Sequence, residues 1–126
     1  MSAQLIISNT TELLRVQAQE VMCIQADGNY STIVLNDGEE CVVGFQLGQL
    51  EQLVDEQLGE SVHEFVRIGR GAIINKRYLF RISLPKQAVA LRSSLGHKVV
   101  MQASKDALRQ LKLLLEQGVK PNGSNG

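Results

Sequence analysis

Apolar residues recur along this chain in short runs, many of them of β-branched valine and isoleucine. Such runs are typical of strands, and the Gly, Asn, Asp and Ser residues between them are typical of turns. The pattern predicts strands over residues 5–8, 12–15, 21–26, 30–35, 40–45, 66–68, 73–74, 79–84, 88–91 and 98–101. Because Asp37-Gly38 is a strong hairpin signal, we expect residues 21–45 to form an antiparallel meander.

One segment shows helical spacing instead. Its apolar residues recur at steps of three and four and form one stripe: Leu47, Leu50, Leu53, Val54 and Leu58. Gly59 suits the end of such a helix. Glu51, Asp55 and Glu56 cover the opposite side. We therefore expect this helix to face away from any polyanion that the protein binds.

A second helix is predicted over residues 105–117, where leucines recur at helical spacing after Ser104, a suitable N-cap. Its basic side chains share one side of the helix: Lys105, Arg109 and Lys112. The predicted fold is therefore mostly β with two or three helices, an α+β fold with antiparallel sheets. We expect one domain over residues 1–117, and residues 118–126, which are rich in Gly and Asn, to be a disordered tail.

Charge is divided unevenly along the chain, although the formal net charge of the 126 residues is zero. Residues 1–64 hold eleven acids and the single base Arg15, a net charge of −10, whereas residues 65–126 hold twelve bases and two acids, a net charge of +10. Such a division favours a polyanionic partner for the second half. An intramolecular belt of surface salt bridges is the alternative.

Cys23 and Cys41 lie in apolar runs without the spacing of a metal or redox motif. We expect two buried free thiols in a reducing compartment rather than a disulfide. The first residues lack the basic and apolar segments of a secretory signal, and no apolar run is long enough to span a membrane. These features predict a cytoplasmic protein that does not bind a membrane.

Catalytic chemistry is poorly supported. His63 and His97 are isolated, and Ser94 with His97 lacks the further residues of a nucleophilic site. Gly69-Arg70-Gly71 lacks the lysine and hydroxyl that complete a phosphate-binding loop. Asp27-Gly28-Asn29 begins like a calcium loop, but the ligand pattern stops there. We therefore predict no enzyme, no metal and no cofactor.

The most unusual stretch is residues 65–82, which contains five basic residues and no acid: Arg67, Arg70, Lys76, Arg77 and Arg81. Within it, Gly69-Arg70-Gly71 predicts a tight loop that exposes an arginine between two flexible positions. Such a loop can be a solvated basic hairpin or a contact to nucleic acid.

Side chains suited to reading DNA occur at three predicted connections. These are the turn Asn29-Tyr30-Ser31, the loop around Arg70, and the helix start at Ser104-Lys105. Asparagine can pair with adenine and arginine with guanine in the major groove. A helix N-terminus adds free backbone N–H groups for a phosphate. Together with the charge division, these positions favour DNA as the partner.

Four stretches together resemble a LytTR-type DNA-binding domain, an output module of bacterial response regulators. They are VMCIQADGNYSTIVLNDGEE, FQLGQLEQLV, FVRIGRGAIINKRYLFRI and VVMQASKDALRQLK, which cover most of the chain in the family's order. The resemblance implies that loops, rather than a recognition helix, enter successive major grooves and bend the duplex. It assigns the three reading loops to Asn29–Ser31, to Gly69 and Arg70, and to Ser104 and Lys105.

The sequence also departs from that family. Gly69 stands where many members have histidine, Gly71 where many have serine, and Lys105 where arginine is usual. An exchange of arginine for lysine replaces a planar fork by a point charge. Asn75 matches a family asparagine that we interpret as structural. Because too few residues precede Leu5 for a receiver domain, the resemblance is to a stand-alone member.

The leading hypothesis is a bacterial transcription regulator that reads duplex DNA, with or without dimerisation on two half-sites. Base readout is assigned to Asn29, Arg70 and Lys105. Phosphate contacts are assigned to five further residues: Arg67, Lys76, Arg77, Arg109 and Lys112. The alternative is a protein–protein interaction module derived from a DNA-binding domain, which the glycines flanking Arg70 support.

Overall fold

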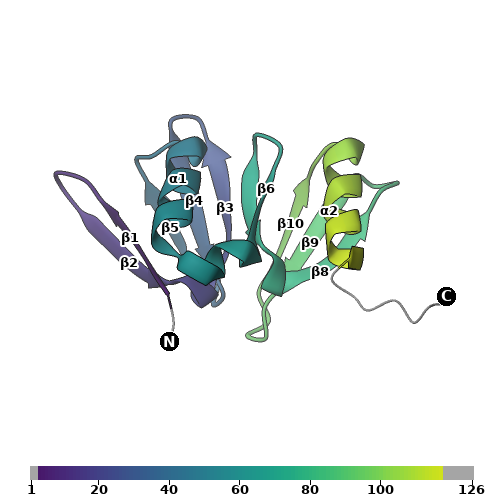
Figure 1. Cartoon of the computed structure of the whole chain (residues 1–126), viewed down its shortest axis with the longest axis horizontal. Coiled ribbons are helices and arrows are strands. Elements are labelled where there is room, and N and C mark those ends of the chain that lie inside the picture. Colours follow the sequence, from purple (N-terminus) through teal and green to yellow (C-terminus); the bar gives the residue numbers. More distant parts are fainter. Residues whose placement is uncertain (1–2, 118–126) are drawn as a thin grey trace.

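Three antiparallel sheets form the framework of the computed structural model, which describes residues 3–117 (Figure 1). The central sheet has five strands in the order β5-β4-β3-β7-β6, and smaller sheets are formed by β1-β2 and by β10-β9-β8. The strands are β1 (Gln4–Ser8), β2 (Leu13–Gln17), β3 (Val21–Asp27), β4 (Tyr30–Leu35), β5 (Glu40–Val43), β6 (Phe65–Ile68), β7 (Ala72–Asn75), β8 (Leu79–Ser83), β9 (Ala88–Arg92) and β10 (Lys98–Gln102). The α-helices are α1 (Leu47–Gln57) and α2 (Lys105–Gln117), and the 3-10 helices are η1 (Ala18–Glu20), η2 (Gly59–Glu64) and η3 (Lys76–Tyr78).

The central sheet separates two hydrophobic cores. Since side chains alternate along a strand, Ile24 and Ile73 face the first core, while Cys23 and Ile74 face the second. The first core is closed by α1 and the β1-β2 hairpin, and the second by α2 and the inner face of β8-β9-β10. Both faces of β3 and β7 are therefore buried, which explains their nearly continuous apolar sequence.

The pairing of β7 with β3 brings distant parts of the chain together. Ile74 lies opposite Cys23, and Ala72 lies opposite Gln25. The Ala26 N–H donates to the Gly71 carbonyl at 2.9 Å beyond the last ladder pair. As a result, the turn between β6 and β7 lies beside the end of β3.

Polar side chains fix α1 in place. Gln46 and Gln49 form a reciprocal capping box at its start. At its other end, the Gln57 side chain accepts from Ile6 N–H at 2.7 Å and donates to Ile6 O at 2.9 Å. Gly59 follows with φ of +55°, as expected for a residue that ends a helix. The first small sheet is thus attached to the helix through backbone groups of β1.

Most predicted elements are confirmed, including the mostly β fold, both α-helices and the antiparallel meander. The strand predicted over residues 40–45 ends at Val43, and the one predicted over 12–15 lies at Leu13–Gln17. The three 3-10 helices were not predicted. The predicted tail, residues 118–126, lies outside the described residues.

The two cysteines are free, as expected, but only Cys23 is fully buried and Cys41 is half-buried. They belong to strands on either side of β4 and face different cores. Strands two places apart are about 10 Å apart, too far for a disulfide. Burial, and secondarily Glu40, raises the pKa of Cys23 to about 12.

Within residues 3–117 we find no helix with the length and apolar character that a membrane crossing requires.

Candidate nucleic-acid interface

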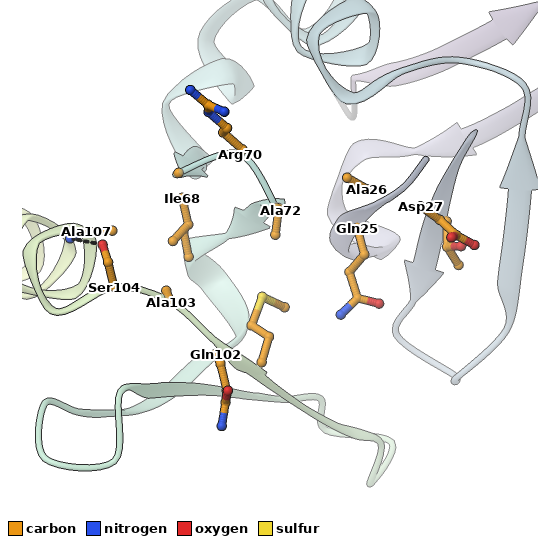
Figure 2. A pocket seen from close by; sticks show the side chains of 14 residues that line it. Gln25, Ala26, Asp27, Ile68, Arg70, Ala72, Gln102, Ala103, Ser104 and Ala107 are labelled. Atoms are coloured by element: carbon orange, nitrogen blue, oxygen red, sulfur yellow. Dashed lines mark hydrogen bonds between the residues drawn. The ribbon is translucent and has the colours of Figure 1, made fainter. Parts of the chain in front are cut away.

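The connections predicted to read DNA lie along one edge of the molecule, at the top of Figure 1. A hollow of about 620 Å³ joins the end of β3, the β6–β7 turn and the start of α2. Figure 2 shows Asp27 and Ser104 on opposite sides of this hollow, with Arg70 extending from the turn between them. We call this the loop edge, and define it by residues 27–30, 69–71 and 103–105.

The first connection is the β3–β4 turn, in which Gly28 has φ of +64° and Asn29 is exposed. Gln46 Nε2 donates to Asn29 Oδ1 at 3.1 Å, which ties the turn to the start of α1. Tyr30 is 55% exposed, with its ring beside Gly44. Asn29 and Tyr30 are therefore presented to solvent at this end of the sheet.

Ser31 has a different position from its neighbours. Its side chain is completely buried, and its hydroxyl donates to the Phe45 carbonyl at 2.7 Å. It shares a strand face with buried Ile33. Ser31 therefore braces the turn against the segment after β5. The sequence analysis placed Ser31 among the DNA contacts, but its side chain does not lie on the loop edge.

The second connection is Gly69-Arg70-Gly71, between β6 and β7. Gly69 has φ of +55°, and nothing lies within 4 Å of the point where a Cβ would stand at either glycine. All three residues are exposed. The turn therefore projects Arg70 from a backbone that has open space on both sides.

Arg67 points toward its own chain. Its Nη1 lies 2.6 Å from Glu51 Oε1 on α1, and its Nε donates to the Gly69 carbonyl at 2.9 Å. A predicted phosphate contact is thus occupied by two internal acceptors. The expectation that α1 faces away from a bound polyanion stays a prediction, although Glu51 contacts Arg67 and thereby lies one side chain away from the second connection.

The third connection leads from β10 into α2. The Ser104 hydroxyl accepts from Ala107 N–H at 3.1 Å, which confirms the predicted N-cap. Lys105 is exposed in the first turn, while Leu108 and Leu111 anchor the helix in the second core. The N-terminus of α2 is therefore held rigidly beside the hollow.

The basic side of α2 is exposed as predicted. Arg109 lies 3.4 Å from Asp106, and Lys112 lies 2.5 Å from Glu116. All four side chains are at least half exposed. Such pairs contribute little to stability and are easily exchanged for other partners, so both cations remain accessible to a phosphate.

Lys76 and Arg77 lie away from the loop edge. They follow β7, whose four residues extend about 13 Å from the Arg70 turn. Arg77 lines a separate hollow with Glu20 and Arg92. Of the predicted residues, Gly69, Arg70 and Ser104 line the hollow of the loop edge. Asn29 and Tyr30 follow Asp27 in the adjoining β3–β4 turn, and Lys105 follows Ser104. Lys76 and Arg77 lie at the opposite end of β7.

Asn75 is 1% exposed, and its amide bridges two chain segments. Its Nδ2 donates to Val21 O at 2.9 Å, and its Oδ1 accepts from Arg77 N–H at 3.0 Å. This geometry agrees with the structural interpretation of Asn75.

Four polar residues of the hollow were missed by the sequence analysis: Gln25, Asp27, Thr32 and Gln102. Gln25 and Thr32 are opposite each other in the β3-β4 ladder, a pairing that the Asp27-Gly28 turn could have indicated. Asp27 places an acid of the first half on the loop edge itself. The division of charge along the chain is therefore not a complete division between faces.

The chain belongs to the LytTr DNA-binding domain family, whose model matches residues 11–116. A solved LytTr DNA-binding domain of a response regulator from Bacillus cereus is similar in structure, with a TM-score of 0.62 and 18% sequence identity over 90% of this chain and 96% of that one. This likeness supports the fold. A comparison with curated proteins gave no match. The class of protein that the family defines is a DNA-binding regulator.

Proposed function

We propose that this domain reads duplex DNA by placing the three connections of the loop edge in the major groove, and thereby regulates transcription in the bacterial cytoplasm. The observation that supports this most directly is the shared hollow, which joins the β6–β7 turn and the N-terminus of α2 to the end of β3. Rigid strands carry these connections, so their spacing is preset before binding.

Each exposed side chain on this edge suits one contact. Arg70 can donate two hydrogen bonds to guanine, and Asn29 can donate its amide to a base edge while Gln46 holds its oxygen. Lys105 adds a point charge beside the free N–H groups of α2. Arg109 and Lys112 bind phosphates along the same helix.

The remaining predicted contacts have other roles in this proposal. Ser31 fixes the first turn from beneath. Lys76 and Arg77 lie outside the primary interface because they are at the other end of β7. A homodimer on two half-sites fits the small reach of a single domain, and two copies of one motif in the selected DNA would support it.

The test begins with selection of bound duplexes from a random pool, followed by binding of variants to the selected and random sequences. Arg70→Ala should weaken binding to the selected site by ~1–3 kcal/mol and relax one base position. Lys112→Ala should weaken binding to all duplexes alike and lower the salt slope by about 1. Arg92→Ala is the matched control, since Arg92 is exposed at the far end of β9.

An Arg70→Ala variant that binds as tightly and selectively as the parent would contradict the proposal. So would selection that yields no enriched sequence.

A protein partner is the second candidate function, and a specific surface supports it. On β8, Phe80 is 40% exposed, and the guanidinium of Arg92 lies 3.7 Å from the ring centroid. Arg81 and Lys98 also lie within 6 Å of that ring. Aromatic and arginine side chains together are typical of protein interfaces. Capture of a protein in a complex that survives high salt, without DNA selectivity, would favour this function.

A further inference from the structure

The arginine next to the second connection joins α1 to the turn that carries Arg70. Arg67 contacts Glu51 at 2.6 Å through Nη1 and the Gly69 carbonyl at 2.9 Å through Nε. A guanidinium donates in fixed directions within one plane, so it can hold both acceptors at once. Glu51 thereby reaches the turn through one intermediate side chain.

The turn has few other restraints. Its two glycines have no side chains to pack, and open space surrounds both positions. On its C-terminal side, Gly71 O accepts from Ala26 N–H. On its N-terminal side, the Gly69 carbonyl accepts from Arg67. Glycines have large conformational freedom, so each of these bonds limits the positions that Arg70 can occupy.

We infer that Arg67 and Glu51 are positioning residues, which hold the Gly69–Arg70 turn in the conformation that meets a base. The inference rests on the proposed function and deepens it. Arg67 acts through the Gly69 carbonyl instead of binding a phosphate, and Glu51 fixes the direction of the guanidinium. An acid of the acidic half thus contributes to recognition of an acidic ligand.

The variant Glu51→Gln distinguishes a phosphate-binding role of Arg67 from a positioning role, because the two roles predict opposite changes in affinity for the selected duplex. If Arg67 bound phosphate, loss of the carboxylate would remove a repulsion and free a cation, so all duplexes would bind more tightly. If Arg67 positions the turn, affinity for the selected duplex should fall roughly tenfold, because a misplaced arginine loses its base contact. Random duplex should bind as before or slightly better.

Asp55→Asn is the matched control. Asp55 is exposed one turn further along α1, and within the described residues it makes no ion pair or side-chain hydrogen bond. The variant removes the same charge from the same helix. Its effect should be equal on selected and random duplexes, and this measures the purely electrostatic change.

Variants of Arg67 complete the test. Arg67→Gln should lose as much selectivity as Glu51→Gln without changing the salt slope, and the double variant should be no worse than either single one. Arg67→Lys can keep the ion pair but lacks the second donor for Gly69, so it should recover only part of the selectivity. Thermal unfolding confirms that each variant is folded.

The inference is overturned if Glu51→Gln behaves like Asp55→Asn, or if Arg67→Gln weakens all duplexes equally and lowers the salt slope by about 1. A parent protein that selects no duplex overturns the proposed function itself. A selective parent that is impaired by Arg70→Ala but not by Glu51→Gln overturns only the positioning role.

Discussion

Replacement of Asn75 by alanine tests whether this buried amide serves the fold or the DNA contact. The side chain is 1% exposed and bonds to Val21 O and to Arg77 N–H. Without it, the Val21 carbonyl loses this partner within a fully buried residue, which costs ~1–3 kcal/mol. Loss of the hydrogen bond to the Arg77 N–H, which is near solvent, costs ~0.5–1.5 kcal/mol. We therefore expect Asn75→Ala to lower the free energy of unfolding by about 2–4 kcal/mol.

The assay is urea unfolding at fixed pH, with the slope m compared between variants to show that the change is one of stability. A domain with ordinary stability of ~5–15 kcal/mol remains folded after such a loss, so its DNA selectivity can be measured and should equal that of the parent. Arg77→Ala keeps its backbone N–H and should change stability by less than ~0.5 kcal/mol. A stable Asn75→Ala variant, or one with altered base preference, would refute the structural role.

Two further predictions concern the thiols and one hairpin turn. Burial raises the pKa of Cys23 from 9.0 to about 12. The folded state therefore retains the thiol proton at a pH where the unfolded state has lost it. As a result, the free energy of unfolding should fall as pH rises from 9 toward 12. Cys23→Ala should remove this slope in urea titrations, and a thiol reagent at pH 8 should modify half-buried Cys41 well before Cys23. Gly38 has φ of +94°, and an added Cβ would lie 2.9 Å from His97 Nδ1; Gly38→Ala should therefore lower the melting temperature more than Gly28→Ala, which has φ of +64° and open space. Equal losses for the two glycine variants would show that the His97 contact is unimportant.

Local pattern was sufficient to predict much of the fold. Short-range chemistry predicts the strands, whose apolar and polar residues alternate or whose two faces are both apolar. It also predicts the helices, whose apolar residues recur at steps of three and four. The Ser104 cap and the Gly59 helix end were found for the same reason. The position of Ser31 was also within reach, because it shares a strand face with Ile33.

The residue positions that the sequence analysis missed are set by contacts between elements that are distant along the chain. The sequence analysis assigned both Arg70 and Lys76 to DNA contacts, but β6 and β7 fold back on each other, so these two residues lie at opposite ends of β7. The ion pair between Arg67 and Glu51 joins residues 16 positions apart on different elements. Neither spacing nor residue type identifies that partner among eleven acids in the first half.

The empty surroundings of Gly69 and Gly71 have a consequence for how such domains diverge. A side chain introduced at Gly71 meets no neighbour, and one at Gly69 need only tolerate a left-handed backbone, which Asn, Asp and His do more readily than other residues. The strands beneath need not adjust to either change. If this turn reads DNA as proposed, new operator preferences are accessible through single substitutions that leave the scaffold intact.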